Sequence, residues 1–187
     1  MTAMTWFDHT TGSIWSQPWG RSIIGEYKNV QLQLLPSQIT TWESWKHEHP
    51  ETLAMINDVE RLGLGRQVFN EDFVIGLLLN GQSIALYYGD VAMVGVVNTN
   101  LAGVPVMVWA ADNNFHAYVR PVGDQILTFN WEERVLKDVE TGSIWDVGRG
   151  YATEGPLMGE ALQPVPGSSS YDWAWRDFYP EAKFYSP

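Results

Sequence analysis

The chain repeats itself at a constant offset of 130 residues. Residues 8–51 align with residues 138–181 without a gap, and fourteen of these 44 pairs are identical. The identical residues are chiefly glycines, prolines, tryptophans and leucines, which specify turns and core contacts rather than catalysis. The repeat therefore constrains architecture first, because two copies of one unit are expected to adopt the same local fold.

Each copy contains Thr-Gly-Ser-Ile-Trp, at residues 11–15 and 141–145. The glycine can adopt the left-handed turn conformation, and the following Ile and Trp resume a strand. An aspartate lies three residues before each turn, where its carboxylate can accept hydrogen bonds from turn amides. We therefore predict a repeated structural motif, formed by Asp8, Thr11, Gly12, Ser13 and Trp15 in the first copy and by Asp138, Thr141, Gly142, Ser143 and Trp145 in the second.

Residues 73–137, between the copies, have the pattern of a β-meander of roughly six strands. Asn80-Gly81 separates two apolar runs and predicts a tight hairpin turn. The predicted strands are 73–79, 83–88, 91–98, 104–111, 115–120 and 125–131, with 134–137 leading into the second copy.

Short helices are predicted at 40–49, 51–62 and 170–178, the first of them with a capping box of Thr40 and Glu43. The expected fold is mainly β. It is an antiparallel meander, barrel-like or sandwich domain with a few short helices and an incomplete internal duplication.

Composition excludes several classes of protein. The chain has 22 acidic and 11 basic residues, and its net charge of −11 argues against nucleic-acid binding. No apolar run reaches the ~20 residues of a membrane-spanning helix, and the first residues lack a signal-peptide core. The absence of cysteine excludes disulfides and thiolate metal sites. A compact, soluble chain is expected, and its compartment stays open.

The motif Asp138-Val-Glu-Thr-Gly-Ser-Ile-Trp145, with Pro164-Val165-Pro166 and Trp173-Ala-Trp-Arg-Asp-Phe-Tyr-Pro180, resembles the C-terminal half of the DUF3179 family, a domain of unknown function. Phe73-Val-Ile-Gly76, Asn80-Gly81, Pro105-Val106 and Ala117-Tyr118-Val119-Arg120 resemble its N-terminal half. Many family members carry a cysteine-rich stretch where this chain has residues 108–115, so no thiol chemistry carries over. Export signals in many members are compatible with an extracytoplasmic setting.

This resemblance predicts a division of the chain. Residues 66–187 would form one complete family domain. Residues 1–65 would form the tail half of a first copy, packed on the main domain. We call residues 8–51 and 138–181 the two tail halves and residues 73–134 the front half, which occurs once in the chain. We expect both tail halves to flank the sheet of residues 73–137, since short β elements are not stable alone.

The sequence offers no convincing catalytic or metal-binding set. His47 and His49 are two apart and would diverge on a helix, so a solvated helix end is favoured. Ser13 and Ser143 are not in a hydrolase nucleophile motif. Asp8 and Asp138 are interpreted as turn residues, although pseudo-symmetry could pair them across a cleft. No cofactor and no metal is predicted, and a non-catalytic function is favoured over an enzyme.

The ten tryptophans fall into two groups. Trp15, Trp45, Trp145 and Trp175 recur in register and are predicted core anchors. The other six lack an in-register Trp partner, and from these Trp19, Trp42, Trp109 and Trp131 are candidates for a ligand or partner surface, with Trp19 and Trp42 the preferred exposed pair. Three functions stay open: an interaction module or accessory subunit with a protein partner or a further copy, a glycan or small-molecule binder, and an enzyme whose site is not visible in sequence.

Overall fold

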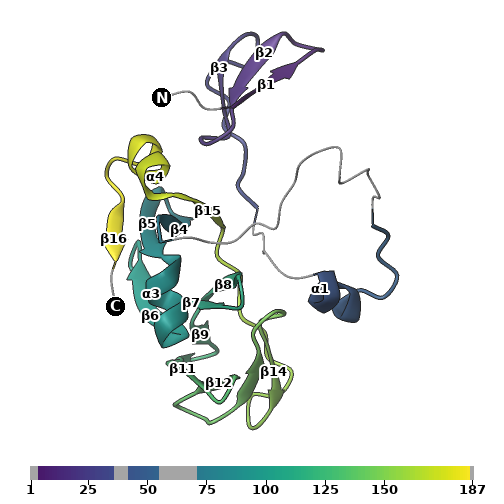
Figure 1. Ribbon diagram of the computed structural model, residues 1–187, viewed down its shortest axis with the longest axis vertical. Helices are drawn as coiled ribbons and strands as arrows, with labels where there is room; N and C mark the ends of the chain where they lie inside the picture. The colour runs from purple at the N-terminus through teal and green to yellow at the C-terminus, as the bar shows by residue number, and fades with distance from the viewer. Residues whose placement is uncertain (1–3, 36–41, 55–70, 186–187) are drawn as a thin grey trace.

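A computed structural model describes residues 4–35, 42–54 and 71–185. The fold is mainly β, with several antiparallel sheets and, in the described residues, no closed barrel, so it agrees with a sandwich. The first copy forms a separate three-stranded sheet, β1 (Thr5–Asp8), β2 (Ser13–Ser16) and β3 (Arg21–Ile24). Helix α1 (Trp42–Glu48) follows it and lies to one side of the other elements (Figure 1).

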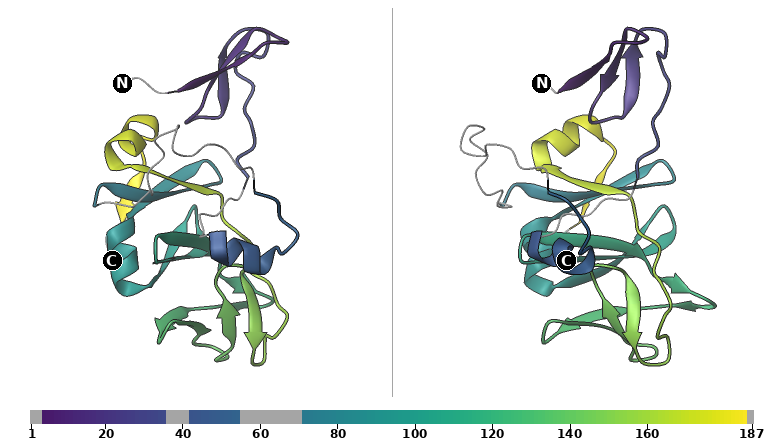
Figure 2. Two further views of the ribbon diagram at one scale, coloured as in Figure 1. Left: turned by 45° about the vertical axis from the view of Figure 1, so that its right-hand side comes forward. Right: turned by 90° about the vertical axis from the view of Figure 1, so that its right-hand side faces the viewer.

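The remainder of the chain forms a stack of layers (Figures 1 and 2). One sheet has the order β15-β4-β5-β16, a second β6-β7-β8, and a third β11-β12-β13-β14, with β9 and β10 paired separately. Helix α4 (Asp172–Phe178) covers the outer face of the first of these sheets, and the β1–β3 sheet lies beyond α4. The strand bounds are β4 Phe73–Leu79, β5 Gln82–Tyr87, β6 Val96–Leu101, β7 Val104–Ala111, β8 Asn114–Val119, β9 Pro121–Val122, β10 Gln125–Ile126, β11 Phe129–Glu132, β12 Val135–Asp138, β13 Ile144–Asp146, β14 Tyr151–Glu154, β15 Gly167–Tyr171 and β16 Lys183–Tyr185.

The layers are held together by strands that are apolar on both faces. In β7, Val106 and Val108 join the core shared with the β4 sheet, while Met107 and Trp109 join the core shared with the β11–β14 sheet. Successive side chains of a strand point to opposite faces, so a near-continuous apolar run is what a strand between two layers requires. The β6–β7–β8 sheet therefore lies between the β4 sheet and the β11–β14 sheet and packs on both.

The two tail halves have the same hydrogen-bonded geometry at the 130-residue shift. Leu32 N donates to Gly20 O at 2.8 Å, and Leu162 N donates to Gly150 O at 2.7 Å. The amide of Tyr27 donates to Ser13 Oγ at 3.1 Å, and that of Leu157 to Ser143 Oγ at 3.0 Å. Helices α1 and α4 occupy residues 42–48 and 172–178, again 130 apart. The duplication predicted from sequence is thus present in the fold.

Four predicted elements differ. The strand predicted at 125–131 is divided into β10 and β11, with residues 127–128 between them outside any strand. Residues 91–98 were expected to form a strand, but α3 (Tyr88–Val94) occupies the first half of this segment and β6 begins only at Val96. The helix ends at Gly95, whose φ of 79° suits a helix C-cap. The helix predicted at 51–62 begins in residues that form a turn and coil, and its remainder lies outside the described residues. At 170–178 the first two residues belong to β15.

The Asn80-Gly81 turn is confirmed, with φ of 48° and 75°. None of the described helices has the length and apolar character needed to cross a bilayer.

Candidate functional site

A groove with a volume of about 540 Å³ lies between the first copy and the second. The first copy contributes Trp6 from β1, the loop at residues 17–20, Arg21 at the start of β3, and residues 31–34. The opposite side consists of Tyr179, just after α4 in the second copy, and of Leu78, Gly81 and Ser83 from the β4–β5 hairpin of the front half. Arg21 is the one charged residue of the lining, and no carboxylate or imidazole among the described residues borders it. The groove is thus an apolar surface with a single cation.

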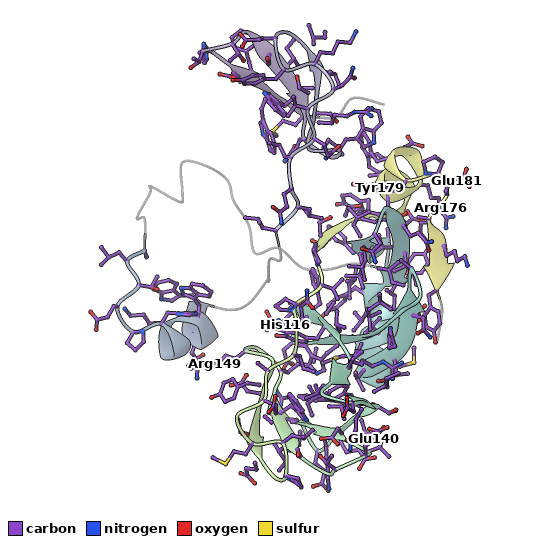
Figure 3. The ribbon with its side chains drawn as sticks, turned by 180° about the vertical axis from the view of Figure 1, so that it is seen from behind. His116, Glu140, Arg149, Arg176, Tyr179 and Glu181 are labelled. Atoms are coloured by element: carbon purple, nitrogen blue, oxygen red, sulfur yellow. The ribbon has the colours of Figure 1, made fainter. Side chains whose placement is uncertain are left out.

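Two hydrogen bonds join the copies at the groove. Trp19 Nε1 donates to Phe178 O at 3.1 Å, and Tyr179 Oη donates to Pro18 O at 2.9 Å. The Trp19 and Phe178 rings also meet edge to face, 5.6 Å apart. Tyr179 lies at the end of α4, below the first-copy sheet (Figure 3). Burial raises its pKa, so the phenol stays protonated and able to donate.

Within the first copy, Gln31 fixes the floor of the groove. Its Nε2 donates to Trp19 O at 2.7 Å and to Leu32 O at 3.1 Å. The guanidinium of Arg21 lies over the Trp19 ring, 5.4 Å from the centroid. These contacts set the loop at 17–21 beside residues 31–34 and hold the groove open.

The second copy shows what covers the equivalent surface there. Tyr118 of β8 donates from its hydroxyl to Val147 O at 2.9 Å and Gly148 O at 3.1 Å. Its ring packs so closely on Gly150 that a Cβ at that glycine would overlap it. At Gly20, the counterpart of Gly150, the nearest atoms to such a Cβ are 3.6 and 3.7 Å away and belong to Gln31 and Leu32. The first copy therefore lacks the ring that fills this position in the second.

The four tryptophans proposed for binding lie in different settings. Trp19 lines the groove and is 40% exposed, and Trp42 is exposed on α1. Trp109 is buried in the core between β7 and the β11–β14 sheet, where it packs edge to face with Trp131 at 5.2 Å. Trp131 is half-buried and packs against Gly95. The structure thus brings Trp109 and Trp131 together as packing residues and leaves Trp19 and Trp42 accessible.

The in-register tryptophans divide by copy. Trp145 and Trp175 are buried, whereas Trp15 and Trp45 are only partly buried. Trp15 packs on Tyr27, with ring centroids 6.3 Å apart, and Trp45 stacks on His49 at 4.0 Å. The four are core anchors only in the second copy, because Trp145 and Trp175 pack with residues of the front half, whereas the ring contacts of Trp15 and Trp45 are within their own copy.

The Thr-Gly-Ser motif has the predicted turn in both copies. Gly12 and Gly142 have φ of 65° and 74°, and each aspartate accepts a hydrogen bond from a turn amide, Asp8 from Thr10 at 2.9 Å and Asp138 from Thr141 at 2.6 Å. The two carboxylates belong to sheets at opposite ends of the molecule (Figure 1), so each serves its own turn.

His116 is buried against Trp109 and Tyr118 on the inner face of β8 (Figure 3). Burial lowers the pKa of the imidazole to about 4, although Asp146 acts in the opposite direction. The ordinary pKa of histidine is 6.5, so below pH 6.5 His116 binds a proton in the unfolded chain but not in the folded chain. Stability therefore falls as the pH drops from 6.5 towards 4.

When the pH is lowered from 6.5 to 5, we expect the titration of His116 to decrease the free energy of unfolding by about 2 kcal/mol. Urea unfolding at the two pH values, compared with His116→Gln, measures the difference. Equal pH dependence in the two proteins would contradict a buried neutral imidazole.

The family model described as "Protein of unknown function (DUF3179)" matches residues 1–62 and again residues 59–182. The chain belongs to the DUF3179 family. The first match is about half the length of the second, as the front half of this DUF3179 chain occurs once. No curated protein and no solved structure matches the chain.

Sequence reasoning missed the groove residues Trp6, Leu34 and Tyr179, and Leu35 in the chain beside the groove. The apolar positions were visible in the sequence, since Leu35 aligns with Val165, and the same offset extended by two residues relates Trp6 to Leu136. What was not visible is that Val165 and Leu136 are covered by the front half, which is a long-range contact. Among the described residues, no group of three or more His, Asp or Glu side chains could hold a metal ion.

Proposed function

We propose that this DUF3179 chain is an interaction module whose first copy binds a protein partner through the apolar groove and the chain beside it, residues 31–35. The observation that carries the proposal is a contrast between equivalent positions. Trp6 is 46% exposed and Leu136 is 1%; Leu32 is 45% and Leu162 is 4%; Leu35 is 66% and Val165 is 4%. The same positions are core in one copy and surface in the other.

This contrast favours a protein surface over a solvated one. Exposed single hydrophobic residues are ordinary, but a contiguous apolar patch on a soluble domain typically marks an interaction site. Trp6, Leu32 and Leu34 line one groove, and Trp19, an aromatic of the type enriched in binding hot spots, is anchored at its rim. Arg21 adds the one charge that could orient a partner.

A photo-crosslinking amino acid placed at Leu34 tests the proposal in cells that express the chain. The expected result is one dominant adduct with another polypeptide, and its loss when Leu32→Glu is added. Met158, which is also apolar and 72% exposed but lies in the second copy, is the matched control position. Failure to form an adduct from Leu34, or equal adducts from Leu34 and Met158, would overturn the proposal.

A second candidate, a glycan or small-molecule site, is favoured by the two indoles of Trp6 and Trp19 in one concave surface. Sugar rings stack on exposed indole faces, and a groove of this volume is of ligand size. Titration with oligosaccharides while intrinsic fluorescence is recorded distinguishes the two functions. A saturable change that Trp19→Ala abolishes would favour the ligand over the protein partner.

A further inference from the structure

The strand β8 of the front half is bound on three sides. One edge pairs with β7, and the other meets residues 163–165, where Val119 N donates to Gln163 O at 2.8 Å and Val165 N donates to Ala117 O at 2.9 Å. Between these two bonds, Tyr118 forms an isolated bridge with Pro164 and packs its ring on Gly150. Backbone pairing and one aromatic anchor thus attach the front half to its tail half.

The first copy presents the same acceptor and donor at residues 33–35. Gln33 aligns with Gln163, and Leu35 aligns with Val165. The neighbouring bridge is present in both copies, as Arg21–Gln31 and Tyr151–Ala161, so the backbone follows the same course to this point. Within the described part of the chain, no strand pairs with residues 33–35. Leu34 and Leu35 are 43% and 66% exposed, as an edge that accepts an added strand requires.

The place of the aromatic ring is also available. Gly20 has φ of 57° and Gly150 has φ of 68°, and their amides donate to Ser16 O at 2.9 Å and Asp146 O at 2.8 Å, so the two turns correspond. The groove over Gly20 is bounded by Trp6, Leu32 and Leu34 and is large enough for a phenol. Tyr179 reaches Pro18 O, the counterpart of one of the two carbonyls that Tyr118 contacts, but its ring does not come within 4 Å of a Cβ at Gly20.

Resting on the proposed function, we propose that the partner inserts a tyrosine-bearing β-strand that adds to residues 33–35 and packs its ring on Gly20. The strand is the equivalent of β8 in another DUF3179-type front half, supplied by a separate polypeptide. The strand β8 of a second copy of this chain is a poor donor, because both its edges are paired and Tyr118 is buried. Two backbone hydrogen bonds, to Gln33 O and from Leu35 N, set the register.

The test uses the full chain and a fluorescein-labelled peptide with the sequence of residues 114–120, Asn-Phe-His-Ala-Tyr-Val-Arg. We expect saturable binding by fluorescence anisotropy, weakened at least tenfold when the tyrosine of the peptide is replaced by alanine. Gly20→Ala should also weaken it at least tenfold, because the added methyl would take the position of the ring. Gly12→Ala is the matched control: Gly12 has φ of 65° and open space around its Cβ position, so the backbone strain is similar while the groove is unchanged.

Three results would overturn the strand proposal: no saturable binding, equal binding of the alanine peptide, or equal loss in Gly20→Ala and Gly12→Ala. If the chain forms a dimer that Gly20→Ala dissociates, a second molecule of this chain fills the groove. That result would also reject the proposal that a different polypeptide donates the strand. An adduct at Leu34 together with any of these results would retain the interaction function and reject only the added strand. A peptide that binds as expected with no adduct in cells would support the strand site and reject the cellular partner.

Discussion

Replacing Trp175 with alanine is expected to lower the free energy of unfolding by about 3–5 kcal/mol, the usual cost of removing a buried indole. Trp175 extends from α4 onto β4, where it is 3% exposed and packs with Val74 and Ala85. Its ring lies so close to Gly76 that a Cβ there would overlap it. The strand has no side chain at Gly76 that could fill the space left by alanine.

The in-register counterpart provides the control. Trp45 on α1 is only partly buried, so Trp45→Ala should cost about 1 kcal/mol or less. Urea unfolding of the three proteins measures the difference through the midpoint at constant m-value. Equal losses at the two tryptophans would show that α1 is packed as α4 is, and would contradict an uncovered first copy.

A double substitution sharpens the result. Gly76→Ala alone should destabilise by about 1–3 kcal/mol, since the methyl forces the indole out of place. In the Trp175→Ala background the same methyl enters the vacated space, so its cost should largely disappear. Additive effects would mean that Gly76 and Trp175 do not share one packing site.

Local chemistry made part of this fold predictable. Asn80-Gly81 requires two positive φ angles, and the Thr-Gly-Ser turns require one at the glycine, so both turns follow from a few adjacent residues. The apolar run at 104–111 likewise predicts a strand, and β7 occupies these residues. The strand prediction was wrong at residues 91–94. Valine and methionine occur in strands and in helices, and only Gly95 marks the end of a helix there.

The site required information that no local pattern contains. Trp109 and Trp19 both lack an in-register Trp partner, so both were candidates for a binding surface. In the structure, Trp109 packs with Leu127, Leu136 and other residues distant in the chain. The alignment of the copies shows that Leu35 and Val165 are equivalent, but whether each is covered depends on where β8 lies. Internal repetition supplies the missing reference, since one copy shows how the other would look when complete.

Replacing Asp138 with alanine is expected to cost about 3–4 kcal/mol, because its carboxylate accepts several hydrogen bonds in a buried site. Trp145 Nε1 donates to Oδ2 at 2.9 Å and Ser143 N to the same oxygen at 3.1 Å, and both donors would lose this partner. Burial alone would raise the pKa of Asp138, but the hydrogen bonds from Trp145, Thr141 and Ser143 outweigh it and lower the pKa below 3.8. The contribution of the carboxylate is therefore complete above pH 3.8 and is lost as the pH falls through the lower folded-state value.

Asp8 is the matched control for this change. It holds the equivalent turn in the more exposed first copy through Thr10 and Thr11, so Asp8→Ala should shift the urea midpoint less than Asp138→Ala does. The variant Asp138→Asn keeps one acceptor oxygen and should fall between wild type and Asp138→Ala. Urea unfolding at pH 7 and pH 3 measures both effects, and the gap between wild type and Asp138→Ala should narrow at pH 3. A gap that is constant with pH would mean that the lost side chain acts by packing rather than by charge, and the buried carboxylate would then not be what stabilises this turn.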